Sequence, residues 1–416
     1  MTKQPVDLLV LGSKETVTVN PGLGSDDIGV IDNGGIAVRA GRFVAAASSE
    51  LLERKFRAKT VISAHDETIL PGFVDPHTHL VFSGSREEEF QLRVRGRHYL
   101  ETLKEGGGIL ETVNRTRQAS PDELFRTATK RLDAALEAGT TTIEIKSGYG
   151  LRLQDEIKML TTIRRLEEHH PCHIVPTFLG AHAIPPECSS PEEYSRTVIN
   201  EMLPKVSGSS LARFCDVFCE QGAFDQKLSL RILNAASKMG LGLKIHADEF
   251  SDHGGTKVAN KIRATSADHL VHSPQKELGK MKITNVTPVL LPASSHSLLM
   301  DKYASAREML SLGLPVALGT DFSPANWAVG QLTVAAIAAR ELGMRAGEIL
   351  KGITTNAARA LGEERTTGSI SPGKRADVVI LKVPNHKWVG YAYGENLVDK
   401  VLIRGKLVVD NGKRVV

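Results

Sequence analysis

Eight β-strand patterns, each followed by a helical pattern, run through the middle of the chain. The strand patterns are short apolar and β-branched runs at residues 73–76, 140–145, 173–178, 214–218, 243–246, 266–268, 286–291 and 316–319. The helical patterns lie at residues 121–137, 153–169, 191–203, 227–239, 254–262, 274–280, 303–312 and 327–342. Several strands are too short to assign singly, so the assignment depends on their regular spacing. Eight strand-then-helix units predict an α/β fold with a closed parallel (β/α)8 barrel of the TIM type.

Both ends of the chain contain strand patterns without this alternation. Short runs broken by Gly, Asn and Asp lie at residues 7–11, 16–19, 35–39 and 42–46, and similar runs lie at residues 376–381, 398–403 and 406–409. We therefore expect a small composite β-sandwich domain built from both termini, residues 1–68 plus 371–416. The catalytic barrel is expected to span residues 69–370.

The composition excludes several classes of protein. Of 416 residues, 41% are hydrophobic and 24% charged, and the net charge of +4 is too weak to indicate a nucleic-acid partner. No apolar run approaches the ~18–20 residues that span a bilayer, and the apolar run before Gly12 is too short for a signal peptide. The four cysteines lack zinc-finger or disulfide-scaffold spacing, which favours reduced thiols in a cytoplasmic enzyme.

Two histidines end the first predicted strand, in the sequence Pro-Gly-Phe-Val-Asp-Pro-His-Thr-His at residues 71–79. Side chains two residues apart on a strand point the same way, so His77 and His79 can reach one metal ion. His246 ends the fifth strand and Asp321 follows the eighth, at the end of the barrel where such active sites lie. Three imidazoles and a carboxylate suit Zn²⁺, with Fe or Mn as alternatives. The competing interpretation of His-x-His is a pair of surface histidines beside a turn.

Further polar residues are expected around the same opening. Glu249 is placed to move a proton to a leaving nitrogen, Asp321 to accept one from the attacking water, and His269 to polarise a substrate oxygen. The alternatives are a solvated acidic turn, which we expect for Asp248, and for His269 a buried, hydrogen-bonded histidine. His182, in the loop after the third strand, faces the same opening.

Three other residues invite more than one interpretation. Lys146 ends the second strand, and one interpretation is a modified lysine that bridges two metals; its distance in chain order from the other ligands favours a single metal. Tyr149 lies in a Ser-Gly-Tyr-Gly loop expected to cover the opening. Arg86 either clamps a substrate carboxylate or pairs with neighbouring glutamates on a helix surface.

Together these residues resemble the amidohydrolase superfamily and, within it, the imidazolonepropionase family of histidine degradation. The superfamily resemblance lies in the run at 71–79, His246, Asp321 and the segment Gly-Ser-Ile-Ser-Pro-Gly-Lys-Arg-Ala-Asp at 368–377. The closer family is matched by Gly-Ser-Arg-Glu-Glu-Glu-Phe at 84–90, Gly-Gly-Gly-Ile at 106–109, Lys-Ser-Gly-Tyr-Gly-Leu at 146–151, Leu-Gly-Ala-His at 179–182, Asp-Val-Phe-Cys-Glu at 216–220 and His-Ala-Asp-Glu at 246–249.

The resemblance implies metal-dependent hydrolysis of the cyclic amide of 4-imidazolone-5-propionate to N-formimidoyl-L-glutamate, with one Zn²⁺ or Fe³⁺ per chain. The implied partner is therefore a small anionic cyclic amide, and we expect a homodimer. The implied metal ligands are His77, His79, His246 and Asp321. The implied catalytic residues are Glu249, His269 and Asp321. The implied substrate contacts are Arg86, Tyr149, His182 and Glu249, with Tyr99 as a weaker candidate.

The chain departs from the family pattern just after Asp321. The family has Phe/Tyr-Asn-Pro-Gly-Ser/Thr, whereas this chain has Phe-Ser-Pro-Ala-Asn at residues 322–326. Because these positions contact substrate or product in the family, Ser323, Ala325 and Asn326 are candidate substrate contacts. Ser323 lacks the amide, and Ala325 lacks the glycine's freedom at positive φ. Substrate choice is the property that this departure leaves open.

Two other functions are compatible with parts of the pattern. A related aminohydrolase, such as a cytosine- or guanine-type deaminase acting on another cyclic amidine, uses the same metal, Glu and His set but does not need Arg86. A non-catalytic barrel that serves in an assembly tends to lose metal ligands, and this chain keeps all four.

Overall fold

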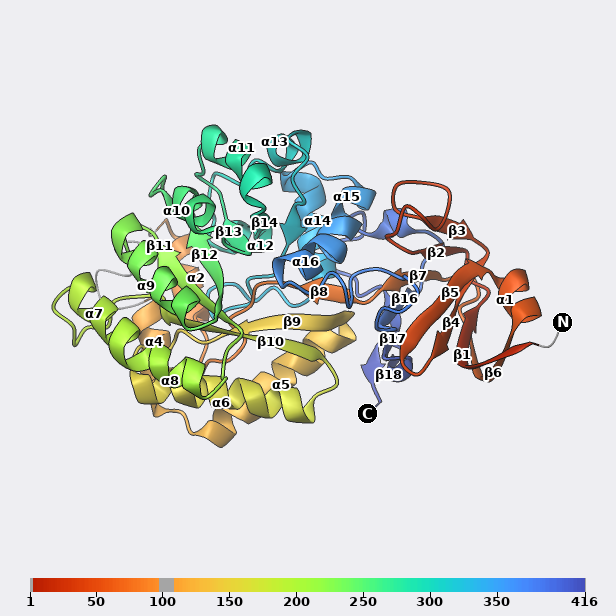
Figure 1. Cartoon of the computed structure of the whole chain (residues 1–416), viewed down its shortest axis with the longest axis horizontal. Coiled ribbons are helices and arrows are strands. Elements are labelled where there is room, and N and C mark those ends of the chain that lie inside the picture. Colours follow the sequence, from red (N-terminus) through yellow and green to blue (C-terminus); the bar gives the residue numbers. More distant parts are fainter. Residues whose placement is uncertain (1–2, 97–107, 416) are drawn as a thin grey trace.

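The computed structural model describes residues 3–96 and 108–415, and it shows a barrel with a β-rich lobe beside it (Figure 1). Eight parallel strands form one sheet in the order of the chain. They are β8 (Phe73–Asp75), β9 (Thr140–Lys146), β10 (His173–Ala181), β11 (Phe214–Cys219), β12 (Gly242–Ala247), β13 (Ser266–His269), β14 (Thr287–Leu290) and β15 (Ala317–Leu318). The eight strands predicted from spacing are thus confirmed, including the two-residue β15.

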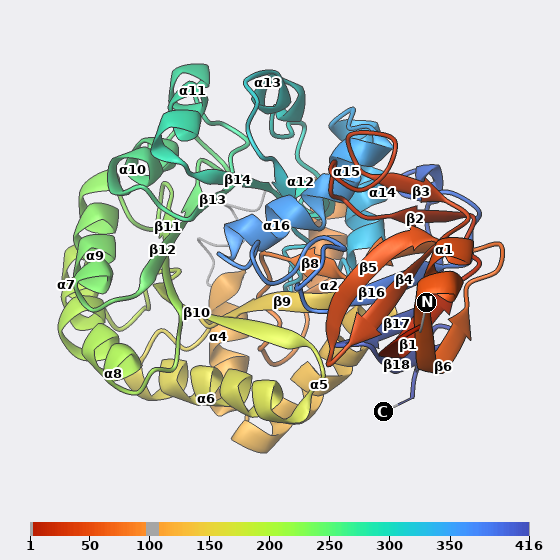
Figure 2. The same cartoon turned by 45° about the vertical axis from the view of Figure 1, so that its right-hand side comes forward.

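Helices surround the strands on the outside of the barrel (Figure 2). Two have the predicted limits, α5 (Pro121–Glu137) and α6 (Leu153–His169). The Ser120 hydroxyl fixes the start of α5 by accepting a hydrogen bond from the Glu123 amide at 3.1 Å, with Pro121 in the first turn. Others shift slightly: α9 (Gln226–Lys238), α10 (Gly255–Ile262), α11 (Gln275–Thr284), α13 (Ala306–Ser311) and α14 (Gln331–Glu341).

Several helices were not predicted. The expected helix at 191–203 is divided into α7 (Pro191–Thr197), a π-helical turn (Val198–Met202) and α8 (Leu203–Gly208). The additional helices are α1 (Ser49–Lys55), α2 (Glu87–Val94), α4 (Ile109–Gln118), α12 (Pro292–Ser297), α15 (Ala346–Gly352) and α16 (Thr355–Ala360). All six have ten residues or fewer, too short for apolar periodicity to identify. None of the helices that the structure describes has the length and apolar character needed to cross a membrane.

The barrel closes between β15 and β8 through bonds beyond the strands themselves. The His79 amide donates to the Phe322 carbonyl at 2.9 Å, and the Asp321 amide donates to the His77 carbonyl at 3.0 Å. The buried side-chain amide of Gln331 also links β8 to β15, because it donates hydrogen bonds to the carbonyls of Val74 at 2.8 Å and Leu318 at 3.1 Å. Backbone bonds at this junction therefore fix two segments that carry predicted metal ligands.

The composite lobe contains two sheets. One has the order β5 (Arg42–Ser48), β4 (Gly34–Arg39), β1 (Gln4–Leu11), β6 (Phe56–Ser63). The other has the order β19 (Lys413–Arg414), β18 (Lys406–Asp410), β17 (Val398–Ile403), β16 (Val378–Leu381), β7 (Thr68–Pro71), β2 (Glu15–Val17), β3 (Val30–Asp32). Ile69 of β7 pairs with Ile380 of β16, so segments from both ends of the chain share one sheet. The predicted lobe from both termini is confirmed, and β7 continues past the expected boundary at residue 68.

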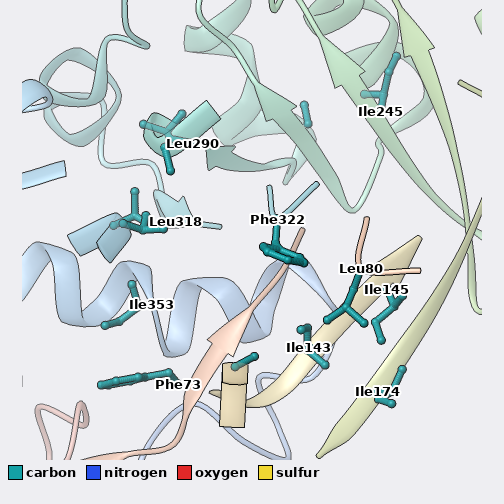
Figure 3. Packing of buried hydrophobic residues seen from close by; sticks show 14 of the residues in the cluster. Phe73, Leu80, Ile143, Ile145, Ile174, Ile245, Leu290, Leu318, Phe322 and Ile353 are labelled. Atoms are coloured by element: carbon teal, nitrogen blue, oxygen red, sulfur yellow. The ribbon is translucent and has the colours of Figure 1, made fainter. Parts of the chain in front are cut away.

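Alternation along the barrel strands separates apolar and charged layers. On β9, Ile143 and Ile145 belong to the main apolar cluster (Figure 3). The same cluster contains Leu132 of α5 and Ile163 of α6. Glu144 and Lys146 point to the opposite face of β9 and are fully buried. Lys146 pairs with Asp216 of β11, and Glu144 pairs with Lys244 of β12. The interior of the barrel is therefore charged below the opening, and this layer supports the residues at the strand ends.

Candidate metal centre and active site

Four predicted metal ligands meet at the carboxyl ends of the barrel strands. The Nε2 atom of His79 lies 3.3 Å from the Nε2 atoms of both His77 and His246. The Asp321 Oδ1 atom lies 3.5 Å from His77 Nε2 and 3.4 Å from His79 Nε2. Donor atoms bonded tetrahedrally to one ion at about 2.0–2.1 Å are separated by about 3.3–3.4 Å. The four side chains therefore surround one point at the spacing of a metal coordination sphere.

The electrostatics of these histidines also fit a cation. Burial and nearby charges lower the pKa values of His77 and His79 well below the ordinary value. The imidazoles are consequently neutral, which is the form that binds metals. The Nε2 lone pairs of neutral imidazoles repel one another and a carboxylate oxygen at this distance, so the arrangement is stabilised by a cation between them. Groups of these buried side chains, His77, His79 and Asp321 among them, could hold a metal ion.

Two more histidines flank this centre. His182 stacks on His79 with ring centroids 4.9 Å apart, and its Nδ1 atom lies 3.0 Å from the Gly148 carbonyl. His269 Nδ1 lies 3.5 Å from Glu249 Oε1, and its Nε2 atom has no hydrogen-bond partner within the described part of the chain. Both therefore face the space beside the centre rather than complete its set of four donors.

A cavity of about 190 Å³, a volume suited to a small molecule, is lined by three of the four donor residues, His79, His246 and Asp321. Most of the predicted site residues share its wall: His79, Arg86, Tyr149, His182, His246, Glu249, His269, Asp321, Ser323 and Ala325. Sequence reasoning did not identify Phe218, Glu220 and Ser294, which also line it. Phe218 lies two positions beyond Asp216 on β11, so strand alternation was the available signal. Tyr99 lies outside the described residues.

The Glu249 carboxyl is buried at this wall, 7% exposed. Burial raises its pKa well above the ordinary value, and the charges of Asp321 and Glu220 act in the same direction. Burial likewise raises the pKa of Asp321 to about 6, against the hydrogen bond from Ser294. Two neighbouring carboxyl groups with displaced pKa values are suited to exchange protons with a reacting molecule.

The expectation of a solvated turn at Asp248 is wrong. Asp248 is fully buried, and its carboxylate accepts hydrogen bonds from the amides of Gly255 at 2.8 Å and Thr256 at 3.1 Å, at the start of α10. Its φ of 53° makes the chain turn sharply before Glu249. The residue thus joins the end of β12 to α10 and directs Glu249 towards the cavity.

The loop around Tyr149 is also fixed by a buried carboxylate. Glu156 of α6 accepts hydrogen bonds from the amides of Gly148 at 3.1 Å, Gly150 at 2.8 Å and Leu151 at 2.9 Å. Gly148 has a φ of 114°, and a Cβ atom there would meet His182 Nδ1 at 2.9 Å. The loop therefore needs glycine to bring Tyr149 and His182 together at the cavity.

Arg86 combines features of both interpretations made from the sequence. Its Nε and Nη2 atoms contact the two carboxylate oxygens of Glu89 at 2.8 and 2.5 Å. Glu89 also accepts from Arg93 Nη1 at 2.7 Å. However, Arg86 is only 6% exposed and lines the cavity, so this pair does not lie on a helix surface. Glu89 holds the guanidinium of Arg86 at the cavity wall.

The segment after Asp321 divides into two roles. Ser323 and Ala325 line the cavity, and Ala325 does not have the positive φ that would require glycine. The Asn326 side-chain amide instead donates to the carbonyls of Thr320 at 2.8 Å and Asp321 at 3.1 Å. Asn326 therefore holds the turn that carries Asp321, and its role as a substrate contact remains a prediction from the sequence.

Lys146 is an ion-paired ammonium group. Its Nζ atom lies 2.7 Å from Glu144 and 2.8 Å from Asp216, and the group is fully buried. Burial opposes its charge, but the attraction of Asp216, Glu144 and Asp268 outweighs burial and raises its pKa. A lysine held in this way is not placed to bridge two metals, which supports the single-metal interpretation.

Comparisons with known proteins agree with this geometry. A model of the amidohydrolase family matches residues 68–408. The imidazolonepropionase of Symbiobacterium thermophilum is 46% identical over 420 residues, covering 99% of both chains. The imidazolonepropionase of Alkaliphilus oremlandii is 44% identical over 418 residues, covering 98% of this chain and 99% of its own.

Solved structures with much lower identity share the fold. An adenosine deaminase from Xanthomonas campestris with bound zinc has a TM-score of 0.75 at 18% identity, covering 100% of this chain and 95% of that one. An atrazine chlorohydrolase from Arthrobacter aurescens complexed with zinc has a TM-score of 0.67 at 16% identity, covering 98% and 96%. Both structures contain zinc, and the fold is the one that the strand spacing predicted.

The raised pKa of Glu249 has a measurable consequence. In the metal-free protein at about pH 6, where exposed glutamates are ionised, Glu249 should remain a carboxylic acid. Infrared difference spectra between wild type and Glu249→Gln should then contain a protonated-carboxyl band that disappears as the pH rises through the raised pKa. The exposed Glu111, paired with Arg115, provides the control Glu111→Gln, which should show no such band. Absence of the band from the Glu249 difference spectrum would mean that this group is ionised.

Proposed function

Because this chain belongs to the amidohydrolase family and, within it, to the imidazolonepropionases, we propose that its His-lined cavity is where 4-imidazolone-5-propionate is hydrolysed to N-formimidoyl-L-glutamate. The observation that supports this most directly is the combination of four metal donors with a buried arginine on one cavity wall. The donors suit hydrolysis of an amide, and the arginine suits an anionic side chain.

The residues that hold the metal are His77, His79, His246 and Asp321, and the proposed content is one Zn²⁺ or Fe³⁺ per chain. Nitrogen and oxygen donors without a thiolate accommodate either ion. When bound, such an ion polarises the amide carbonyl and lowers the pKa of water towards ~7. The remaining tasks fall to residues of the chain: moving protons, placing the ring and neutralising the substrate carboxylate.

Hydrolysis requires a proton to leave the attacking water and a proton to reach the ring nitrogen. The C–N bond of the ring breaks as a new C–O bond forms, so the nitrogen gains the proton that the water has lost. Asp321 is placed to accept the proton from water, and the Glu249 carboxyl to deliver one to the nitrogen. The raised pKa of Glu249 keeps a proton on its carboxyl for that transfer.

His269 is proposed to stabilise the substrate oxygen. Burial lowers its pKa well below the ordinary value, so the ring is neutral and carries one N–H. Nδ1 faces Glu249 at 3.5 Å, whereas Nε2 has no hydrogen-bond partner among the described residues. With the proton on Nε2, the ring donates a hydrogen bond to the carbonyl oxygen as negative charge develops there.

Substrate contacts are proposed for Arg86, Tyr149, His182, Ser323 and Ala325, which line the cavity. Arg86 binds the propionate carboxylate, and the aromatic rings of Tyr149 and His182 form a wall for the planar heterocycle, with centroids 5.3 Å apart. A deaminase acting on an uncharged ring has no use for a buried arginine in this place. A cytoplasmic homodimer remains a prediction from the sequence.

Product analysis tests the proposed reaction. Freshly generated 4-imidazolone-5-propionate should be converted to N-formimidoyl-L-glutamate without release of ammonia, because the ring opens and keeps both nitrogens. The alternative aminohydrolase would release ammonia from cytosine- or guanine-type rings. Ammonia from such a ring, together with no turnover of imidazolonepropionate, would contradict the proposal.

The role of Arg86 can be tested separately. Arg86→Ala should lower kcat/KM about ten- to a hundredfold, since a charge-assisted, desolvated pair contributes roughly 1.5–3 kcal/mol. Arg86→Lys should recover only part of this, because lysine lacks the planar two-donor fork. Arg165, whose partly exposed side chain pairs with Asp122 at 2.6 Å outside the cavity, supplies the control Arg165→Ala, which should leave kcat/KM unchanged. An uncharged substrate analogue should be insensitive to Arg86→Ala; an equal loss with both substrates would show that Arg86 does not bind the carboxylate.

A further inference from the structure

Below the metal centre, five charged side chains from four barrel strands form one buried network. They are Glu144, Lys146, Asp216, Lys244 and Asp268, and all are 0% exposed. Lys146 Nζ lies 2.7 Å from Glu144 and 2.8 Å from Asp216, and Lys244 Nζ lies 2.8 Å from Glu144. Burying five charges is unfavourable unless they are paired, and a packed apolar interior would stabilise a barrel at least as well. The network therefore calls for a functional explanation.

Two of its carboxylates contact the metal-facing histidines from behind. Asp268 Oδ2 lies 2.6 Å from His77 Nδ1, at hydrogen-bond geometry. Asp216 Oδ2 lies 3.0 Å from His246 Nδ1, a close ion-pair contact without hydrogen-bond geometry, and Asp216 Oδ1 accepts a hydrogen bond from the His246 backbone amide at 3.2 Å. A carboxylate that accepts a hydrogen bond from Nδ1–H keeps the proton on that nitrogen. The Nε2 lone pair is then free to face a metal, and the ring orientation is fixed.

The third histidine is held differently. His79 Nδ1 has no hydrogen-bond partner within the described part of the chain, and its ring instead stacks on His182. The contacts behind His77 and His246 are therefore not a general property of histidines at this opening. They occur where the ligand side chain lies against the charged layer of the barrel.

The lysines support both the carboxylates and the backbone. The ammonium groups of Lys146 and Lys244 lie 3.8 and 4.0 Å from the Asp268 carboxylate. Lys244 Nζ also donates to the Pro76 carbonyl at 2.9 Å, immediately before His77. Two ammonium groups among three carboxylates leave the layer with a net negative charge, which favours a cation at the strand ends.

The network itself is not suited to hold a second metal. His77, Glu144 and Asp268 do offer ligand atoms within 4.8 Å of one another. However, the Lys146 ammonium lies 2.7 Å from Glu144 and 3.8 Å from Asp268, and the Lys244 ammonium lies 2.8 and 4.0 Å from them. Two positive charges already occupy the positions around these carboxylates.

We propose that Asp268 and Asp216 are positioning residues for the metal ligands His77 and His246, and that Lys146 and Lys244 hold these carboxylates in place. This inference rests on the metal site of the proposed function and assigns a task to residues that never touch substrate. Asp268 fixes the tautomer and orientation of the His77 ring, and Asp216 positions His246 through its backbone amide and a close contact to Nδ1. Metal affinity, rather than folding alone, should therefore depend on them.

The test measures metal affinity of the stripped protein by competition with a chelator, using Zn²⁺ as the probe. Asp268→Asn and Asp216→Asn should each weaken Zn²⁺ binding by about 10- to 100-fold. The control is Glu220→Gln, because Glu220 is an equally buried carboxylate at the same opening, but it binds the Phe250 amide at 2.9 Å instead of a metal ligand. It should leave Zn²⁺ affinity unchanged. Absorption spectra of the Co²⁺-loaded proteins should change for the two Asp variants and not for Glu220→Gln.

A milder variant covers the case in which an Asp variant does not fold. The Ser266 hydroxyl donates to Asp268 Oδ1 at 2.7 Å, so Ser266→Ala loosens Asp268 without removing its charge, and it should weaken Zn²⁺ binding by a smaller factor. Wild-type protein that binds no Zn²⁺ would contradict the proposed metal site itself. Wild-type protein that binds Zn²⁺, with folded variants that bind it equally well, would overturn the positioning roles alone.

Discussion

Three imidazole nitrogens and one carboxylate oxygen, each 3.3–3.5 Å from at least one of the others, are the constraint on which the rest of the barrel opening depends. Such crowding of electron-rich atoms is unfavourable without a cation between them, yet the surrounding structure enforces it. Backbone hydrogen bonds at the junction of β8 and β15, the two ends of the strand order, fix His77, His79 and Asp321. His246 comes from β12, in the middle of that order. The same bonds that close the barrel therefore also define the site.

Burial gives this site its chemistry. The opening excludes water from Glu249 and Asp321, which raises both pKa values and allows carboxyl groups to carry protons near neutral pH. A neighbouring side chain fixes the turn that carries each of these carboxyl groups. Asp248 binds the start of α10 and fixes the turn before Glu249, and Asn326 donates to the backbone of the turn that carries Asp321. The acid–base residues are thus placed by rigid turns at strand ends, as positioning of a reacting group requires.

The barrel strands and the position of most metal ligands follow from the sequence. The roles of several supporting residues depend on tertiary contacts, which the periodicity of apolar residues along the chain does not reveal. Strand spacing predicted all eight barrel strands, and the parallel topology placed His77, His246 and Asp321 at one end of the barrel. Asp248 was misjudged because a carboxylate in a turn is usually solvated, and only the tertiary structure brings the amides of α10 to it. Asn326 and Glu89 have roles set by neighbours in space. Asp216 and Asp268 carried a usable signal, since each lies on the interior face of a strand, but their pairing with histidines depends on strand register.

The central claim is that the four donors form one metal site that is required for hydrolysis. The most direct measurement is to strip the protein with a chelator, return Zn²⁺ or iron in fractions of an equivalent, and follow both bound metal and hydrolysis of freshly generated 4-imidazolone-5-propionate. The account predicts that stripping abolishes activity and that activity returns linearly, reaching its maximum at one bound ion per chain. Full activity in the metal-free protein, or a maximum reached only at two ions per chain, would contradict it.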